Sequence, residues 1–334
     1  MGPVSDWLAE NVAGAAPPFA FSLIVGGHSN LTYRVEAANG ACFVLRRPPL
    51  GAVLATAHDM SREHKIITGV AKTAVPVPKA LGLCEDESVN DAPFYVMNFV
   101  AGHVLDTSEI AGKVLPEPGL RSALGQSVIE TLAKLHGVDP DAVGLGDLGR
   151  KEAYLDRQLK RWRTQWEKSK TRELPAMEET YELLLAAKPE QKYTGIVHGD
   201  YRIGNMLSGD DAQVKAVLDW ELCTLGDTLA DVGYVMNNWA QPGDPDADGS
   251  PTSIGGFPSR EEFIEAYSKR TGHEVTSVDY YRSFQYWRLA AIVEGVLARY
   301  LKGVMGDDKP DTGVFKQRID RLAESALHLV RSLG

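Results

Sequence analysis

Cysteine is scarce in this sequence. Its 334 residues include three cysteines, Cys42, Cys84 and Cys223, an odd number whose spacing matches no common metal site. Disulfide frameworks occur mainly in secreted proteins, whereas unpaired thiols are typical of a reducing compartment. We therefore expect a cytoplasmic protein without a cysteine-based metal site.

Long apolar runs are also missing. The apolar stretch at residues 289–301 is interrupted by Glu294 and Arg299, whereas a transmembrane helix needs about 20 predominantly apolar residues. Residues 1–6 contain no basic segment before an apolar core, which a secretion signal would require. We expect neither a membrane span nor a secretion signal.

The sequence also lacks an excess of positive charge. It has 35 Lys and Arg against 45 Asp and Glu, a formal charge of -10. Nucleic-acid binding relies on basic side chains that neutralise phosphates, so we expect no nucleic-acid partner. A cationic substrate is permitted but only weakly favoured. The length and the average apolar and charged fractions, 44% and 24%, fit a folded two-lobed enzyme rather than a disordered or fibrous chain.

One motif carries most of the functional information. His198-Gly199-Asp200 is followed by Asn205 and then by Asp219-Trp220-Glu221. Enzymes that transfer a phosphoryl group need a carboxylate facing the attacking hydroxyl, and they need oxygen ligands for magnesium. The spacing predicts that Asp200 faces the hydroxyl while Asn205 and Asp219 bind Mg²⁺.

The predicted strands around this motif support that interpretation. Residues 193–197, 206–208 and 214–218 have the composition and alternation of short strands, and residues 208–211 form a turn. Pairing of the last two strands would bring Asn205 close to Asp219. The alternative is that these Asp and Asn side chains simply bond their own backbone in turns.

The first hundred residues predict a nucleotide-binding half. The small-residue loop 26–30 precedes a predicted strand at residues 31–35, Asn39-Gly40 predicts a two-residue hairpin, and residues 42–46 form the returning strand. Such a loop can place its backbone over phosphates, although Gly-Gly before a strand is often an ordinary turn. The candidate phosphate contacts in the loop are Gly27, Ser29 and Asn30.

A buried ion pair is predicted beside this loop. Residues 58–71 have helical periodicity that places Glu63 on the apolar stripe, where a carboxylate needs a partner. Arg46 shares a strand face with Val44 and Cys42, so it is the natural partner. Alternatively, Glu63 reaches solvent and pairs with Arg62 or Lys65.

The rest of the chain is predicted to be mainly helical, with core helices around residues 124–135, 154–170 and 281–301. Arg161, Trp162, Arg163 and Trp166 form a basic aromatic cluster that could bind an anionic planar group, or could be a core stripe with solvated arginines. Residues 241–259 are rich in Gly, Pro, Asp and Ser and predict either a mobile lid or a surface insertion.

Taken together, these segments resemble the aminoglycoside phosphotransferase and choline kinase group of protein-kinase-like enzymes. Within that group, the chain is most similar to the kinase-like domain of some acyl-CoA dehydrogenases. The resemblance runs from about residue 21 to residue 300. It implies an α+β, protein-kinase-like, two-lobed fold: an antiparallel sheet with a helix in residues 1–98, and a mainly helical lobe in residues 99–334.

The resemblance also implies roles for individual residues. It makes Asp200 catalytic, Asn205 and Asp219 the magnesium ligands, and Glu63 the partner of the phosphate-binding cation. The interlobe hinge, residues 97–100, would meet adenine through the backbone of Asn98 and Val100. Two further matches concern cations. Arg46 stands where most of the wider fold has Lys, and this departure leaves the choice of nucleotide open. Arg202 matches a Lys that reaches the transferred phosphoryl group in protein kinases. Alternatively, Arg202 only anchors the loop.

We therefore expect an enzyme that uses ATP and Mg²⁺ to phosphorylate a hydroxyl group of a small molecule. A hydroxyacyl-CoA is the first expectation for the acceptor, and it rests on resemblance alone. An aminoglycoside, an amino alcohol or a sugar is the alternative. A nucleotide-binding pseudokinase that acts as a binding module is the alternative of another class, although Asp200, Asn205 and Asp219 are all present.

Overall fold

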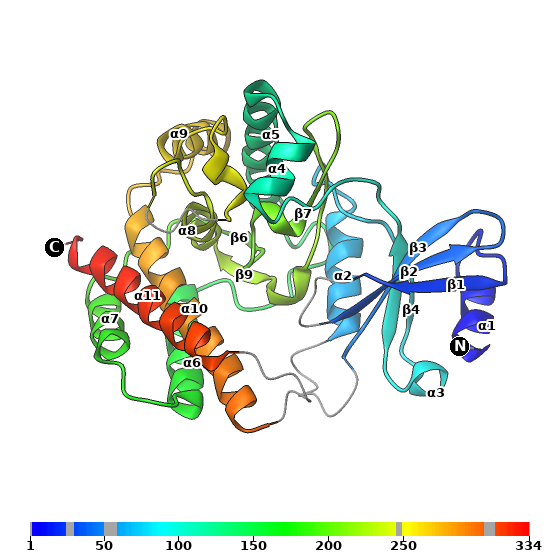
Figure 1. Cartoon of the computed structure of the whole chain (residues 1–334), viewed down its shortest axis with the longest axis horizontal. Coiled ribbons are helices and arrows are strands. Elements are labelled where there is room, and N and C mark those ends of the chain that lie inside the picture. The colour runs from blue at the N-terminus through cyan, green and yellow to red at the C-terminus, as the bar shows by residue number, and fades with distance from the viewer. Residues whose placement is uncertain (1, 25–29, 50–58, 245–248, 304–310, 334) are drawn as a thin grey trace.

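The computed structural model describes residues 2–24, 30–49, 59–244, 249–303 and 311–333. Figure 1 shows an antiparallel sheet with few helices on one side of the molecule and a mainly helical part on the other. This arrangement confirms the α+β, two-lobed, kinase-like fold. The final strand of the sheet ends at Asn98, the last residue of the predicted first lobe.

The sheet has five strands in the order β1-β2-β3-β5-β4, and every neighbouring pair is antiparallel. The strands are β1 (Phe19–Leu23), β2 (Leu31–Ala37), β3 (Cys42–Arg47), β4 (Ala80–Cys84) and β5 (Phe94–Asn98). Its helices are α1 (Gly2–Asn11), α2 (Met60–Val70) and α3 (Glu87–Asn90).

Strand alternation divides the sheet into two apolar faces. Phe43 and Leu45 of β3 pack with α1 in one buried cluster. Val44 belongs to a second cluster, which continues through α2 into the helical part of the chain. Arg46 follows Val44 on this second face, and it is therefore directed toward the junction between the two parts.

The hairpin between β2 and β3 lies where the sequence predicts it, but its loop is longer than expected. The Ala37 N–H donates to Ala41 O at 2.8 Å, which encloses three residues rather than two. Gly40 has φ of 82°, and its N–H donates to Ala37 O at 2.9 Å. A turn followed by a left-handed glycine is the usual three-residue hairpin solution.

Helix α2 begins later than predicted because Asp59 caps it. The Asp59 side chain accepts a hydrogen bond from the Arg62 N–H, which satisfies one of the free donors at the helix start. Predicted residue 58 lies outside the described residues. The inward side chains include Met60, Ile67 and the carboxylate of Glu63.

The helical part encloses two small antiparallel sheets, β6 paired with β9 and β7 paired with β8. The strands are β6 (Thr194–Val197), β7 (Met206–Ser208), β8 (Val214–Val217) and β9 (Thr224–Asp227). The sequence analysis predicted the first three of these strands and missed β9. Met206 lies opposite Val217, so the Leu218 N–H donates to Asn205 O at 2.8 Å. The predicted approach of the two motif segments is therefore confirmed.

The surrounding helices are mostly long. They are α4 (Ser108–Val114), α5 (Pro118–His136), α6 (Tyr154–Ser169), α7 (Pro175–Ala186), α8 (Leu229–Asn238), α9 (Arg260–Thr271), α10 (Val278–Leu301) and α11 (Thr312–Arg331). Short 3-10 turns occur at Ile203–Asn205, Trp220–Leu222 and Pro251–Ile254. Over the described ranges, no helix combines the length and the apolar character needed to cross a membrane.

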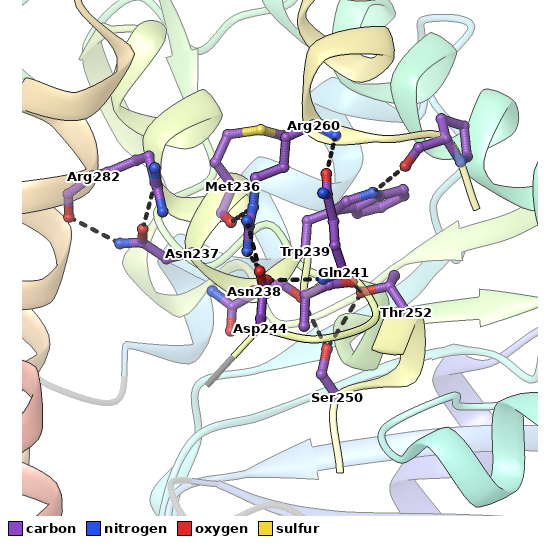
Figure 2. A network of polar contacts seen from close by, with 12 residues as sticks. Met236, Asn237, Asn238, Trp239, Gln241, Asp244, Ser250, Thr252, Arg260 and Arg282 are labelled. Carbon is purple, nitrogen blue, oxygen red and sulfur yellow. Dashed lines mark hydrogen bonds and ion pairs between the residues drawn. The ribbon is translucent and has the colours of Figure 1, made fainter. Parts of the chain in front are cut away.

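The segment after α8 forms hydrogen bonds and an ion pair with its surroundings on both sides of residues 245–248, which lie outside the described residues. Figure 2 shows Asp244 paired with Arg260, and Gln241 bonded to both the Asp244 side chain and the Arg260 backbone. The Trp239 indole donates to Pro258 O at 2.8 Å, and the Thr252 hydroxyl donates to Ala240 O at 2.7 Å. The described parts of this segment, for which the sequence left a lid and a surface insertion open, are thus bonded to the end of α8 and to the start of α9.

Candidate active site

The loop that carries Asp200 is held by a buried carboxylate on α8. Asp231 is fully buried, and its two oxygens accept the His198 N–H at 2.7 Å and the Gly199 N–H at 2.8 Å. Burial alone would raise the pKa of Asp231, but these bonds and the neighbouring His136 outweigh it, so the net shift is downward. Asp231 therefore fixes the backbone immediately before Asp200.

His198 joins the two halves of the motif. Its ring is fully buried, its Nε2 lies 3.0 Å from Leu218 O, and its Nδ1 lies 3.2 Å from the Asp200 N–H. A neutral ring with the proton on Nε2 satisfies both contacts. The Trp220 ring lies 4.6 Å from the His198 ring. The imidazole therefore sets the spacing between the Asp200 loop and the segment that carries Asp219.

Asp200 and Asn205 are in direct contact. The Asn205 amide nitrogen donates to Asp200 Oδ2 at 2.6 Å and to Asp200 O at 2.9 Å. Within the described residues, Asp200 Oδ1 is buried without a hydrogen-bond partner, and Arg202 Nε lies 3.6 Å from it. Asp200 Oδ1 therefore faces the Arg202 guanidinium, whereas Oδ2 is held by Asn205.

Arg46 connects the sheet to the helix and to the motif. Its Nε lies 2.9 Å from Glu63 Oε2, and a second guanidinium nitrogen lies 2.6 Å from Asp219 Oδ1. The predicted pairing of Arg46 with Glu63 is therefore confirmed. Arginine can contact two carboxylates at once because its donors form a rigid fork, which the compact ammonium of lysine does not.

The environment of this pair shifts both pKa values upward. Burial raises the pKa of Glu63, and the charge of Arg46 opposes that shift only in part. Burial lowers the pKa of Arg46, but the charges of Glu63, Tyr95 and Asp219 outweigh burial. The Tyr95 hydroxyl and the Asn30 amide also donate to the two oxygens of Glu63, at 3.1 and 3.0 Å. The guanidinium is therefore firmly cationic and fixed in direction.

The remaining predicted nucleotide contacts lie in different surroundings. Asn30 is buried, and its amide also lies 3.3 Å from Glu221 Oε2, so it links α2 to the segment after Asp219. The Asn98 N–H donates a hydrogen bond to Lys79 O, and the Lys79 N–H donates one to the side-chain oxygen of Asn98. Val100 is half-buried. Gly27 and Ser29 lie outside the described residues.

The donor set at the motif fits magnesium better than a structural metal. Within the described ranges, no three His, Cys, Asp or Glu side chains are arranged to hold an ion. Asp219 supplies a carboxylate from a left-handed backbone conformation, with φ of 64°, and Asn205 uses its nitrogen on Asp200. Magnesium usually takes one or two protein carboxylates and completes its shell with phosphates and water, so these residues suit it.

Two residues near Asp200 were missed by the sequence analysis. Tyr234 follows Asp231 by three positions on α8 and thus shares its helix face. Burial raises the pKa of Tyr234, and the charge of Asp200 raises it further. Arg288 of α10 donates to Gly199 O at 3.0 Å. Helical spacing could have identified Tyr234, but no local pattern indicates Arg288.

Comparisons with known proteins agree with this geometry. The sequence matches the phosphotransferase enzyme family over residues 20–277. It is 36% identical over 286 residues to acyl-CoA dehydrogenase family member 10 of Mus musculus, covering 83% of this chain and 26% of that protein. The chain spans 26% to 41% of the length of curated relatives that it matches.

Solved structures give the same picture. A putative aminoglycoside phosphotransferase from Ralstonia eutropha is 32% identical, with a TM-score of 0.83 over 99% of this chain and 98% of that one. The aminoglycoside phosphotransferase APH(4)-Ia, as a thermostable mutant bound to AMP-PNP and hygromycin B, has a TM-score of 0.61 over 97% of this chain and 99% of that one. At 17% identity, the second likeness concerns the fold alone.

Proposed function

Because the chain belongs to the phosphotransferase enzyme family, we propose that it transfers the terminal phosphoryl group of ATP to a hydroxyl group of a small molecule. The observation that carries the proposal is the joint placement of Asp200, Asn205 and Asp219. His198 and Asp231 hold the two loops that carry them. Phosphoryl transfer depends mainly on positioning and on electrostatic stabilisation, and this arrangement can supply both.

Each residue has a distinct role in this mechanism. Oδ1 of Asp200, the oxygen not bonded by Asn205, accepts the proton of the acceptor hydroxyl and orients the hydroxyl oxygen for attack. Asn205 and Asp219 would hold Mg²⁺, which would supply positive charge to the phosphate oxygens. Arg46, oriented by Glu63, contacts the nucleotide phosphates. Arg202 contacts the transferred group, where a cation stabilises negative charge in the transition state.

The nucleotide would bind between the sheet and the helical part. The backbone of residues 97–100 would meet adenine, and the proposed phosphate contacts Gly27, Ser29 and Asn30 would lie on the phosphate side; the first two are outside the described residues. Support comes from the AMP-PNP complex of a protein with the same fold. The contacts of Arg46 with two carboxylates place a cation beside the proposed metal site, where triphosphate oxygens would lie.

A hydroxyacyl-CoA is the first candidate for the acceptor. It is supported by the similarity of this chain to part of acyl-CoA dehydrogenase family members. An aminoglycoside is the second candidate, supported by the structural neighbours that bear that name. An amino alcohol or a sugar would use the same catalytic residues with different acceptor contacts.

The test measures ADP production with MgATP and a panel containing a hydroxyacyl-CoA, an aminoglycoside, an amino alcohol and a sugar. The wild type should phosphorylate one class far better than the others, because acceptor contacts in the transition state set the ratio. Asp200→Asn should keep MgATP affinity within a few-fold and lose on the order of a hundredfold or more in transfer, the range for a positioned general base. Nucleotide binding without transfer to any acceptor would favour the pseudokinase alternative.

A further inference from the structure

A cavity of about 290 Å³ lies beside the catalytic loop, between the start of α2, the segment after Asp219, and helices α6 and α10. This is far more space than one water molecule needs. Gly199, the residue before Asp200, forms part of its wall. A molecule held in the cavity would therefore lie next to the residue proposed as the general base.

Three arginines line this cavity: Arg62, Arg161 and Arg288. Arg62 donates to two carbonyl oxygens, those of Leu148 and Cys223, at 3.0 and 2.9 Å. In the described part of the chain, none of the three guanidinium groups lies within ion-pair distance of a carboxylate, whereas several other arginines of the protein have such a partner.

Arg288 is the most informative of the three. It is only 5% exposed, and its hydrogen bonds go to Gly199 O and to Gln285 Oε1, which are both neutral. Its Nε is buried and has no hydrogen-bond partner among the described residues. A buried charge is costly unless it is paired, so this cation lacks the anion that would stabilise it.

The indole ring of Trp162 forms cation–π contacts with two of these arginines. The Arg161 and Arg288 guanidinium carbons lie 5.2 and 5.4 Å from the centre of its indole ring. The Arg161 side chain is exposed in part, yet partial burial lowers its pKa, and repulsion from Arg288 lowers it further. Arg163 and Trp166, the other members of the predicted basic aromatic cluster, instead contact Glu178. The cluster therefore divides, and only its Arg161 and Trp162 half faces the cavity.

The acidic side chains of the cavity wall are engaged elsewhere. Glu63 and Glu221 lie 2.9 and 3.9 Å from Arg46, on the side of the proposed nucleotide site. Asp59 accepts the Arg62 N–H as the cap of α2. The side chains of Arg161 and Arg288 thus make the α6 and α10 side of the cavity positive, and Arg62 adds a third cation from α2.

We propose that the cavity binds an anionic group of the acceptor, a phosphate or a carboxylate, through Arg161, Arg288 and Arg62. Arginine binds both groups well because its planar donors can form two parallel hydrogen bonds. That the anionic group belongs to an acceptor rests on the proposed function. Binding of the anion itself does not require catalysis. The attached remainder of the molecule would extend past Gly199 toward Asp200.

Calorimetric titration with inorganic pyrophosphate and with citrate, without nucleotide or metal, tests the proposal. Arg161→Met should weaken binding of the preferred anion by about tenfold or more, the loss expected for a charged hydrogen bond. Lys160→Met is the matched control, because it removes the same charge from the adjacent exposed residue of α6 and should change the affinity by about twofold at most. The preferred anion distinguishes a phosphate-bearing acceptor from a carboxylate-bearing one.

Any of three titration results would overturn the proposal: neither anion binds the wild type, both variants bind as the wild type does, or both variants weaken binding equally. Melting temperatures of the two variants show whether each is folded. If pyrophosphate or citrate binds as expected but no acceptor is phosphorylated, the cavity assignment stands and the kinase proposal fails. If a neutral or cationic acceptor is phosphorylated and neither anion inhibits the reaction, the kinase proposal stands and the anion site is refuted.

Discussion

Replacing Glu63 with glutamine would test whether the ion pair with Arg46 serves the reaction more than the fold. Glu63 is 2% exposed, and it has contacts with Arg46, Tyr95 and Asn30. Glutamine keeps the shape and one oxygen acceptor but removes the charge. Arg46 would then keep only the carboxylates on its other side, of which Asp219 is the nearer at 2.6 Å.

Two effects of different size are expected from this change. Breaking a buried ion pair costs about 3–5 kcal/mol, but Arg46 retains Asp219, so the free energy of unfolding should fall by only about 2–3 kcal/mol. The loss in kcat/KM should be larger, on the order of a thousandfold, or about 4 kcal/mol. The reason is that Arg46, no longer held by Glu63, is drawn toward Asp219 and disturbs both the phosphate contact and the proposed magnesium ligand.

Urea unfolding and steady-state kinetics with MgATP measure the two effects. The assays are run at about pH 8, well above the ordinary carboxyl pKa, because burial raises the pKa of Glu63. Tyr95→Phe is the matched control, since it removes one hydrogen bond to the same carboxylate and leaves the charge pair intact. It should cost about 1 kcal/mol of stability and only a few-fold in rate.

The reasoning would be refuted if Glu63→Gln lost no more activity than Tyr95→Phe. It would also be refuted if the fall in stability accounted for the whole change in activity. Either result would mean that Glu63 contributes to packing at the junction but does not orient Arg46 for the reaction.

Two further predictions concern the motif. Asp219→Ala should abolish magnesium-dependent ATP binding while the protein stays folded, because Asp219 is the charged protein ligand of the proposed site; calorimetry that finds unchanged affinity with magnesium present would remove it from that site. Asp231→Asn should be less stable than the wild type near neutral pH, with a difference that shrinks in acid. The folded-state pKa of Asp231 lies below its ordinary value of 3.8, so its contribution is complete above about pH 5 and is lost progressively as the pH falls toward the depressed pKa. Urea unfolding from pH 7 to pH 3 measures this difference, and a constant one would contradict the assignment.

The sequence by itself determined the parts that depend on local spacing. The alternation of β3 directs Val44 and Arg46 to one face, and the helical period of α2 places Glu63 opposite that face. The short strands and turn around Asn205 and Asp219 bring those two residues together. These inferences succeed because strand and helix periods fix side-chain direction within a few residues.

Only the tertiary structure decided how these segments are held relative to one another. Asp231, which holds the loop of Asp200, lies 33 residues after His198 in the sequence. Arg288 contacts Gly199 over a separation of 89 residues. Arg46 contacts Asp219 over a separation of 173 residues. Strand β9 and the cavity beside α6 likewise depend on how distant elements pack. The periodicity of a single strand or helix does not indicate which remote elements it will contact. Those contacts depend on the burial of apolar side chains and on the hydrogen bonding of buried polar groups in the whole fold.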